Sequence, residues 1–177
     1  MQADQRSQCK YVASQCACFN LRKVARLVTQ IFDRHLAEYG LKSTQFTLLV
    51  ATALGRSASL TRLSQALAMD RTTVTRNLRP LAKEGLVWIG LGSNMRTRSV
   101  TLTAKGEALL QVGIEPWQRA QGEIVLAFGE DRWGRLLADL NQMGEAVNAL
   151  KSQRISSKPG GAARALSGTD ILSSRLQ

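Results

Sequence analysis

The chain has 177 residues, 44% of them hydrophobic, so it can bury the core of one ordinary domain. Its formal net charge of +11 favours a polyanionic partner, either nucleic acid or an anionic membrane surface. One histidine and three cysteines argue against a structural zinc site and a disulfide framework, and no apolar stretch approaches the roughly 18–20 residues that span a bilayer.

The first sixteen residues, MQADQRSQCKYVASQC, contain no apolar signal-peptide core, so we expect a cytoplasmic protein that does not bind membranes. Apolar residues then recur every three or four positions over residues 19–36, which predicts an amphipathic helix. A second helix is predicted to run to Gly55, with Ser43 or Thr44 as its N-cap.

The next two predicted helices are arranged as a helix-turn-helix. The first is short and begins at Ser59 or Thr61, and a brief break follows at Met69 and Asp70. Asp70 can cap the second helix, which has Val74, Leu78 and Leu81 on its inner face and ends at Gly85. Pro80 lies inside this helix and should bend it or loosen its last turns, since proline lacks an N–H.

In a helix-turn-helix, the second helix enters the DNA major groove by its N-terminal end. Arginine can contact guanine with two hydrogen bonds, and threonine offers a hydroxyl to bases or phosphates and a methyl group to thymine. The exposed candidates at this end are Arg71, Thr72, Thr73, Thr75 and Arg76.

Two short strands are predicted at residues 86–89 and 99–102, separated by a loop rich in glycine and polar residues. A hairpin directly after the recognition helix is a wing. Its tip carries Arg96 and Arg98, which would reach the minor groove or the DNA backbone, where arginine meets concentrated negative potential.

Two long helices are predicted at residues 104–127 and 131–150, the first with a kink near Gly113 and Pro116. Residues 151–177 are rich in Ser, Gly and Arg, and we expect them to form a disordered tail. The predicted fold is therefore mainly α with a small two-stranded wing, in which a winged helix-turn-helix is flanked by long helices.

The distribution of charge supports DNA binding. Residues 56–105 contain nine Lys or Arg against two Asp or Glu, whereas residues 106–150 contain three against seven. A single exposed arginine is usually an ordinary solvated residue, but the helix order, the local charge and the arginine-tipped wing together favour DNA.

One alternative is a winged-helix protein-interaction module, which would tend to lose these arginines. An enzyme is not expected, because no nucleophile–base pair, phosphate loop or metal-ligand spacing is present, and no cofactor or metal is implied.

The stretches SLTRLSQALAMDRTTVTRNLRPLAKEGLV and RTRSVTLTAKG resemble the winged helix-turn-helix of the MarR family, the multiple antibiotic resistance regulators. The resemblance covers roughly residues 18–150. It implies a DNA-binding lobe at about 41–103 and dimerisation helices at about 18–38 and 104–150. It also implies a homodimeric repressor on a pseudo-palindromic operator, with release by a small aromatic or phenolic ligand or by an oxidant.

By the same resemblance, Arg71, Thr72, Thr73 and Arg76 match recognition-helix contact positions, and Arg96 matches the wing arginine. The family usually has an aspartate two residues before that arginine, which helps to brace it. Here that position is Asn94, which can accept a hydrogen bond but forms no ion pair, so Arg98 is a second candidate for the same role.

Three further residues have two interpretations each. Cys18 precedes Phe19, and a Cys-Phe pair lies at a similar place in MarR regulators that sense organic hydroperoxides; Cys9 or Cys16 could then act as a resolving thiol. Free cysteines are more often packing residues. His35 is either a ligand-binding or pH-sensitive group or an interface residue. Trp117 belongs either to the core or to a crevice for aromatic acids.

Overall fold

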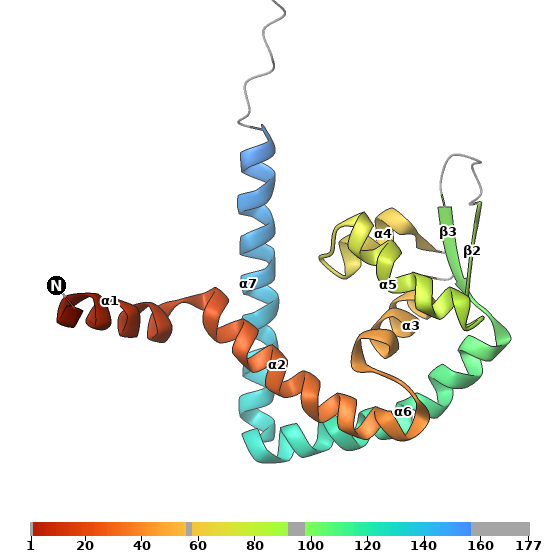
Figure 1. Ribbon diagram of the computed structural model, residues 1–177, viewed down its shortest axis with the longest axis horizontal. Helices are drawn as coiled ribbons and strands as arrows, with labels where there is room; N and C mark the ends of the chain where they lie inside the picture. Colours follow the sequence, from red (N-terminus) through yellow and green to blue (C-terminus); the bar gives the residue numbers. More distant parts are fainter. Residues whose placement is uncertain (1, 56–57, 92–97, 157–177) are drawn as a thin grey trace, which may run out of the picture. The chain divides into compact units, whose positions relative to one another are not determined.

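A computed structural model describes residues 2–55, 58–91 and 98–156 of the chain. It contains two compact units, Met1–Phe128 and Gly129–Gln177, which are treated separately. The elements of the first unit are α1 (Gln2–Gln15), α2 (Ala17–Leu36), η1 (Ala37–Tyr39), α3 (Ser43–Gly55), β1 (Ala58–Ser59), α4 (Leu60–Ala66), α5 (Arg71–Lys83), β2 (Val87–Leu91), β3 (Arg98–Leu102) and α6 (Ala104–Phe128) (Figure 1). The second unit contains α7 (Glu130–Ser156). None of the described helices is long and apolar enough to cross a membrane.

Helix α1 was not expected from the sequence. Its larger apolar residues, Tyr11 and Val12, stay exposed, so no buried stripe marks it as a helix. Its junction with α2 is closed by polar contacts. The Asn20 amide donates to the carbonyl oxygens of Ala13 at 3.1 Å and Cys16 at 2.9 Å, which satisfies groups that a helix end leaves without partners.

The start of α3 differs from the prediction. The helix begins at Ser43 itself, so the expected capping by a Ser43 or Thr44 side chain is wrong. Instead, the Asp33 carboxylate on α2 accepts a hydrogen bond from the Ser43 N–H at 2.7 Å. The Gln45 side chain reaches back to the Lys42 N–H at 3.0 Å. A tertiary contact thus replaces a local cap.

The turn between α4 and α5 is closed by backbone hydrogen bonds. Ser59 caps α4 by accepting from the Arg62 N–H at 3.2 Å, which identifies the correct one of the two predicted starts. Ala68 then adopts a left-handed conformation with φ 50°, and the Met69 N–H donates to the Ser64 carbonyl at 2.9 Å. This Schellman arrangement ends α4 and sets the direction of α5.

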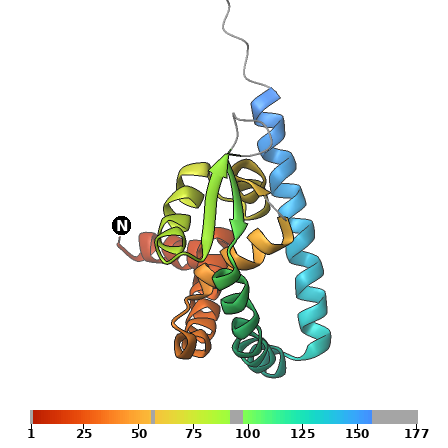
Figure 2. The ribbon, with the colours of Figure 1, turned by 90° about the vertical axis from the view of Figure 1, so that its right-hand side faces the viewer.

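The sheet has three antiparallel strands in the order β1-β3-β2. In the predicted wing hairpin, Val87 pairs with Leu102 and Leu91 pairs with Arg98. The two-residue strand β1 pairs with β3 through Ala58 and Ser59, and it is too short to be recognised by alternation. Figure 2 shows α6 leaving the base of the hairpin.

The core lies between helices α2 to α5 and the sheet. Its fully buried members are Leu36, Leu49, Leu63, Val74, Leu78, Leu81 and Val100. Helix α5 continues past Pro80 to Lys83. Helix α6 curves along its length (Figure 1) and contains buried Pro116, which provides no N–H for the preceding turn. Helix α7 continues six residues past the predicted end at residue 150.

Candidate DNA-binding interface

The N-terminal turn of α5 is fixed by Asp70. Its carboxylate accepts from the Thr73 N–H at 2.8 Å and from the Thr73 hydroxyl at 2.7 Å. The bond from the Thr73 side chain is the main reason that the pKa of Asp70 lies below its usual value, and the backbone bond acts in the same direction. The acid form would lose these bonds, so the ionised cap holds the first turn in place.

The candidate recognition residues fall into two groups. Arg71 donates to the Thr61 hydroxyl on α4 at 2.6 Å, and the Thr75 hydroxyl donates to the Arg71 carbonyl at 2.8 Å. Together with Thr73, these side chains therefore have partners within the protein. Thr72 and Arg76 are exposed, and no hydrogen bond joins their side chains to any described residue. Their spacing of four residues places them on one face of α5.

The same face of α5 also carries Arg79, which the sequence interpretation did not select. Arg79 is exposed and follows Arg76 by three residues. Its helical spacing from Arg76 is the signal in the sequence that identifies it. On the opposite face, Val74, Leu78 and Leu81 are fully buried, so they fix which residues of α5 point outward.

The described part of the wing includes Arg98, which is exposed at the start of β3 opposite Leu91. The predicted wing residues Arg96 and Asn94 lie outside the described residues. The next two residues of β3, Ser99 and Val100, are buried and anchor the strand. Arg98 thus projects from a strand that the core holds in position.

The base of the wing is joined to α6 through the TAKG segment. The Thr103 hydroxyl lies 2.6 Å from the Gly85 carbonyl oxygen, and it accepts from the Gly106 N–H at 3.0 Å. The Lys105 ammonium donates to the Glu84 carbonyl at 2.8 Å. A Cβ on Gly106 would lie 1.9 Å from the Leu86 carbonyl oxygen, so the start of α6 is in backbone contact with the residue directly before β2.

A pocket of about 260 Å³ lies beside the recognition helix. Phe32, Phe46 and Trp117 contribute aromatic side chains to its lining, and Asn77 of α5 and Met69 of the preceding turn also border it. The Phe32 and Trp117 rings stack with centroids 6.5 Å apart. The structure therefore places Trp117 in a crevice that α5 also borders.

The three cysteines lie around the junction of α1 and α2, and all are free thiols. Cys18 and Cys9 are exposed. Cys16 is half-buried and caps α2, because its Sγ accepts from the Phe19 N–H at 3.4 Å. The predicted redox residue is thus accessible, and one neighbouring thiol has a structural role.

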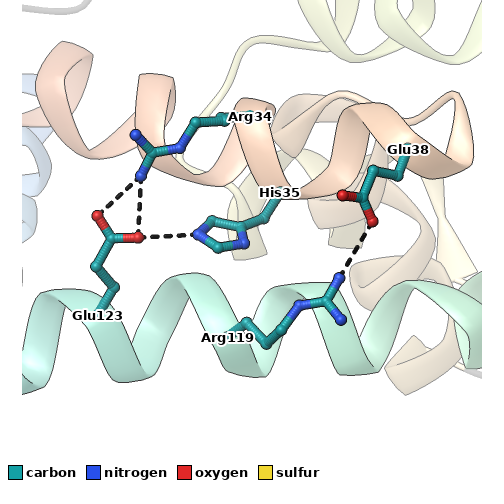
Figure 3. A network of polar contacts seen from close by, with 5 residues as sticks. All are labelled: Arg34, His35, Glu38, Arg119 and Glu123. Carbon is teal, nitrogen blue, oxygen red and sulfur yellow. Dashed lines mark hydrogen bonds and ion pairs between the residues drawn. The ribbon is translucent and has the colours of Figure 1, made fainter.

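Helices α2 and α6 are joined by ion pairs centred on Glu123 (Figure 3). Glu123 binds Arg34 at 2.8 Å and His35 Nε2 at 2.9 Å. One turn away, Arg119 binds Glu38 at 3.3 Å and Glu115 at 3.1 Å. The hydrogen bond from His35, followed by that from Arg34, lowers the pKa of Glu123 below its ordinary value. His35 thus lies in a contact between two helices.

Replacing Glu123 with Gln should make unfolding easier near pH 7 and should have less effect in acid. The lowered pKa means that the folded state holds the Glu123 proton less tightly than the unfolded state. The stabilisation is therefore complete above the ordinary pKa of 4.5 and is lost as the pH falls through the lowered value. Urea unfolding of the wild type and of Glu123→Gln, at pH 7 and in acid, measures this difference in the free energy of unfolding. Glu115→Gln is the control, since Arg119 is the one ion-pair partner of Glu115 among the residues that the structure describes. If the difference in stability between Glu123→Gln and Glu115→Gln did not change with pH, it would contradict the assignment of the stabilisation to ionised Glu123.

Comparison with solved structures gives matches to transcriptional regulators. No protein-family model and no curated protein matches the sequence. Among solved structures, the transcriptional regulator MosR of M. tuberculosis, crystallised in complex with DNA, is 35% identical with a TM-score of 0.70, covering 77% of this chain and 98% of MosR. The repressor CouR, bound to a 23-mer DNA duplex, is 22% identical with a TM-score of 0.68, covering 75% of this chain and 95% of CouR. A mutant E. coli MarR complexed with operator DNA is 19% identical with a TM-score of 0.68, covering 75% and 96%.

The helix-turn-helix of α4 and α5, followed by the β2–β3 hairpin, defines a winged helix-turn-helix protein. The likeness to CouR and MarR supports this fold, and the higher identity to MosR over nearly its whole length shows the family. The chain belongs to the MarR family of transcriptional regulators.

Proposed function

We propose that this protein is a homodimeric repressor that binds a pseudo-palindromic DNA operator in the cytoplasm. The observation that carries the proposal is the exposed Thr72 and Arg76 on a helix whose start is capped and whose inner face is buried. The proposed contact residues are Arg71, Thr72, Thr73, Thr75, Arg76, Arg96 and Arg98, to which we add Arg79. Arg76 and Thr72 would contact bases. Thr73 and Thr75, whose hydroxyls bond within the protein, would stabilise the helix.

Exposed apolar surface supports the homodimer. On α2, Leu21, Val24 and Leu27 are between 39% and 54% exposed. Helix α7 carries exposed apolar side chains at helical spacing: Leu137, Leu140, Met143, Val147 and Leu150. Such rows on a soluble regulator indicate protein–protein contact. In the proposed dimer, the two recognition helices would lie roughly 34–36 Å apart, which is one turn of duplex DNA.

The pocket beside Trp117 supports release by a small aromatic acid or phenol. Phe32 and Trp117 would stack on the ring of such a ligand. Because Asn77 and Met69 border the same pocket, an occupant would contact the recognition helix and the turn before it. Binding there would then favour one position of α5 over another.

Cys18 supports release by an oxidant as a second route. An organic hydroperoxide would oxidise the exposed thiol to a sulfenic acid and be reduced to an alcohol. A second thiol from Cys9 or Cys16 could then form a disulfide with loss of water. We expect cumene hydroperoxide to weaken DNA binding by the wild type and not by Cys18→Ser, with dithiothreitol restoring the wild type. Equal responses of the two proteins would remove Cys18 as a sensor.

The proposed function is tested by selecting bound fragments from sheared genomic DNA and titrating them in gel shifts. We expect enrichment of a sequence with two half-sites about 10 base pairs apart from centre to centre. Binding that shows no sequence preference would contradict a specific regulator. It would instead favour a winged-helix module that binds other proteins.

A further inference from the structure

A second groove lies between α3 and α4. Its volume is about 490 Å³, within the roughly 300–1,000 Å³ typical of small-molecule sites. Its lining includes Val50, Ala51 and Leu54 from α3 and Ala66 from α4. Leu54 is 82% exposed, so a large apolar side chain stands in the groove with almost no protein contact.

The chemistry of this groove differs from that of the pocket beside Trp117. That pocket has three aromatic side chains in its lining, whereas the described residues that line the α3–α4 groove include none. An aliphatic wall offers dispersion contacts and burial to a flexible hydrocarbon chain, without a ring on which an aromatic ligand could stack.

Among the described residues, one cation borders the groove. Arg62 lines it and is exposed, and no hydrogen bond or ion pair joins its guanidinium to the described parts of the chain. A planar guanidinium is suited to binding a carboxylate through two hydrogen bonds. We propose that the α3–α4 groove binds a medium-chain aliphatic carboxylate, with the hydrocarbon chain along Val50, Leu54 and Ala66 and the carboxylate at Arg62.

The position of the groove gives such a ligand access to the helix-turn-helix. Thr47 and Leu67 line both this groove and the pocket beside Trp117. Leu67 is also the C-cap of α4 and directly precedes Ala68, the left-handed residue of the turn. A ligand in the groove therefore contacts the residue that leads from α4 towards the recognition helix.

Calorimetric titration of the full chain with octanoate, without DNA, tests the proposal. We expect binding by the wild type and roughly tenfold weaker binding by Arg62→Gln, which removes the charged partner. Ala66→Leu should also weaken binding, because it fills the groove at an exposed helix position that accepts leucine. Arg135→Gln, which removes an equal charge from exposed α7, is the control and should bind octanoate as the wild type does. The neutral 1-octanol should bind less tightly than octanoate.

Three results would overturn the proposal. The first is absence of octanoate binding by the wild type. The second is wild-type affinity in both Arg62→Gln and Ala66→Leu, or loss of binding in Arg135→Gln, either of which would show that the carboxylate is not held at Arg62 in this groove. The third is equal affinity for octanol, which would remove the role of the Arg62 charge. Because the titration contains no DNA, its outcome is independent of operator binding.

Discussion

Gly106→Ala should destabilise the folded protein by roughly 3 kcal/mol, at the upper end of the range for overpacked sites. The added Cβ would lie 1.9 Å from the Leu86 carbonyl oxygen, which belongs to the backbone and cannot move away by rotating a side chain. That carbonyl also accepts from the Thr103 N–H at 3.1 Å. The substitution therefore separates the start of α6 from the strand that leads into the wing.

Chemical denaturation followed by circular dichroism measures this effect. Gly122→Ala is a matched control, because Gly122 lies in the same helix and nothing is within 4 Å of its added Cβ. That variant should be unchanged or more stable by up to about 1 kcal/mol, since alanine favours helix over glycine. Similar unfolding midpoints for Gly106→Ala and the wild type would show that the backbone at Leu86 shifts at little cost to make room for the added Cβ.

Arg76→Ala should weaken operator binding by about 1–3 kcal/mol, which is roughly a 5- to 150-fold loss of affinity. The structure gives the Arg76 side chain no hydrogen-bond partner within the described chain, and buried Val74 and Leu78 fix the face from which it projects. Its removal should leave stability nearly unchanged, because it is an exposed helix residue and alanine is a good helix former. Gel-shift titration on the selected operator gives the affinity.

Two companion variants separate base reading from charge. Arg76→Lys keeps the charge but replaces the rigid planar guanidinium with a flexible ammonium, so it should weaken the two-bond contact to guanine and lower discrimination at one base pair. Arg135→Ala removes an equal charge from exposed α7 and should leave operator affinity nearly unchanged. If Arg76→Ala bound the operator as tightly as the wild type, Arg76 would not be a base-reading residue.

Local signals in the sequence predicted the recognition helix well. Asp70 as its cap, Gly85 at its end and Val74 and Leu78 on its inner face are all found in the structure. These features depend on residues within a few positions of one another, so periodicity and capping preferences are sufficient to detect them. For the same reason, Ser59 was among the predicted starts of α4.

Features that join distant residues could not be predicted in this way. The cap of α3 comes from Asp33 on another helix, and β1 exists only because it pairs with β3. The interpretation of Thr73 and Thr75 also changed, because their hydroxyls have partners inside the protein.

The sequence by itself determined the order of the helices from α2 to α7, the wing and the basic character of residues 56–105, because each follows from neighbouring residues and their charges. Only the tertiary structure decided which candidate side chains remain available to DNA, how Gly106 fits against the wing and which side chains surround the two pockets. The physical reason is that exposure and close packing depend on contacts between segments remote in the chain, which local patterns do not specify.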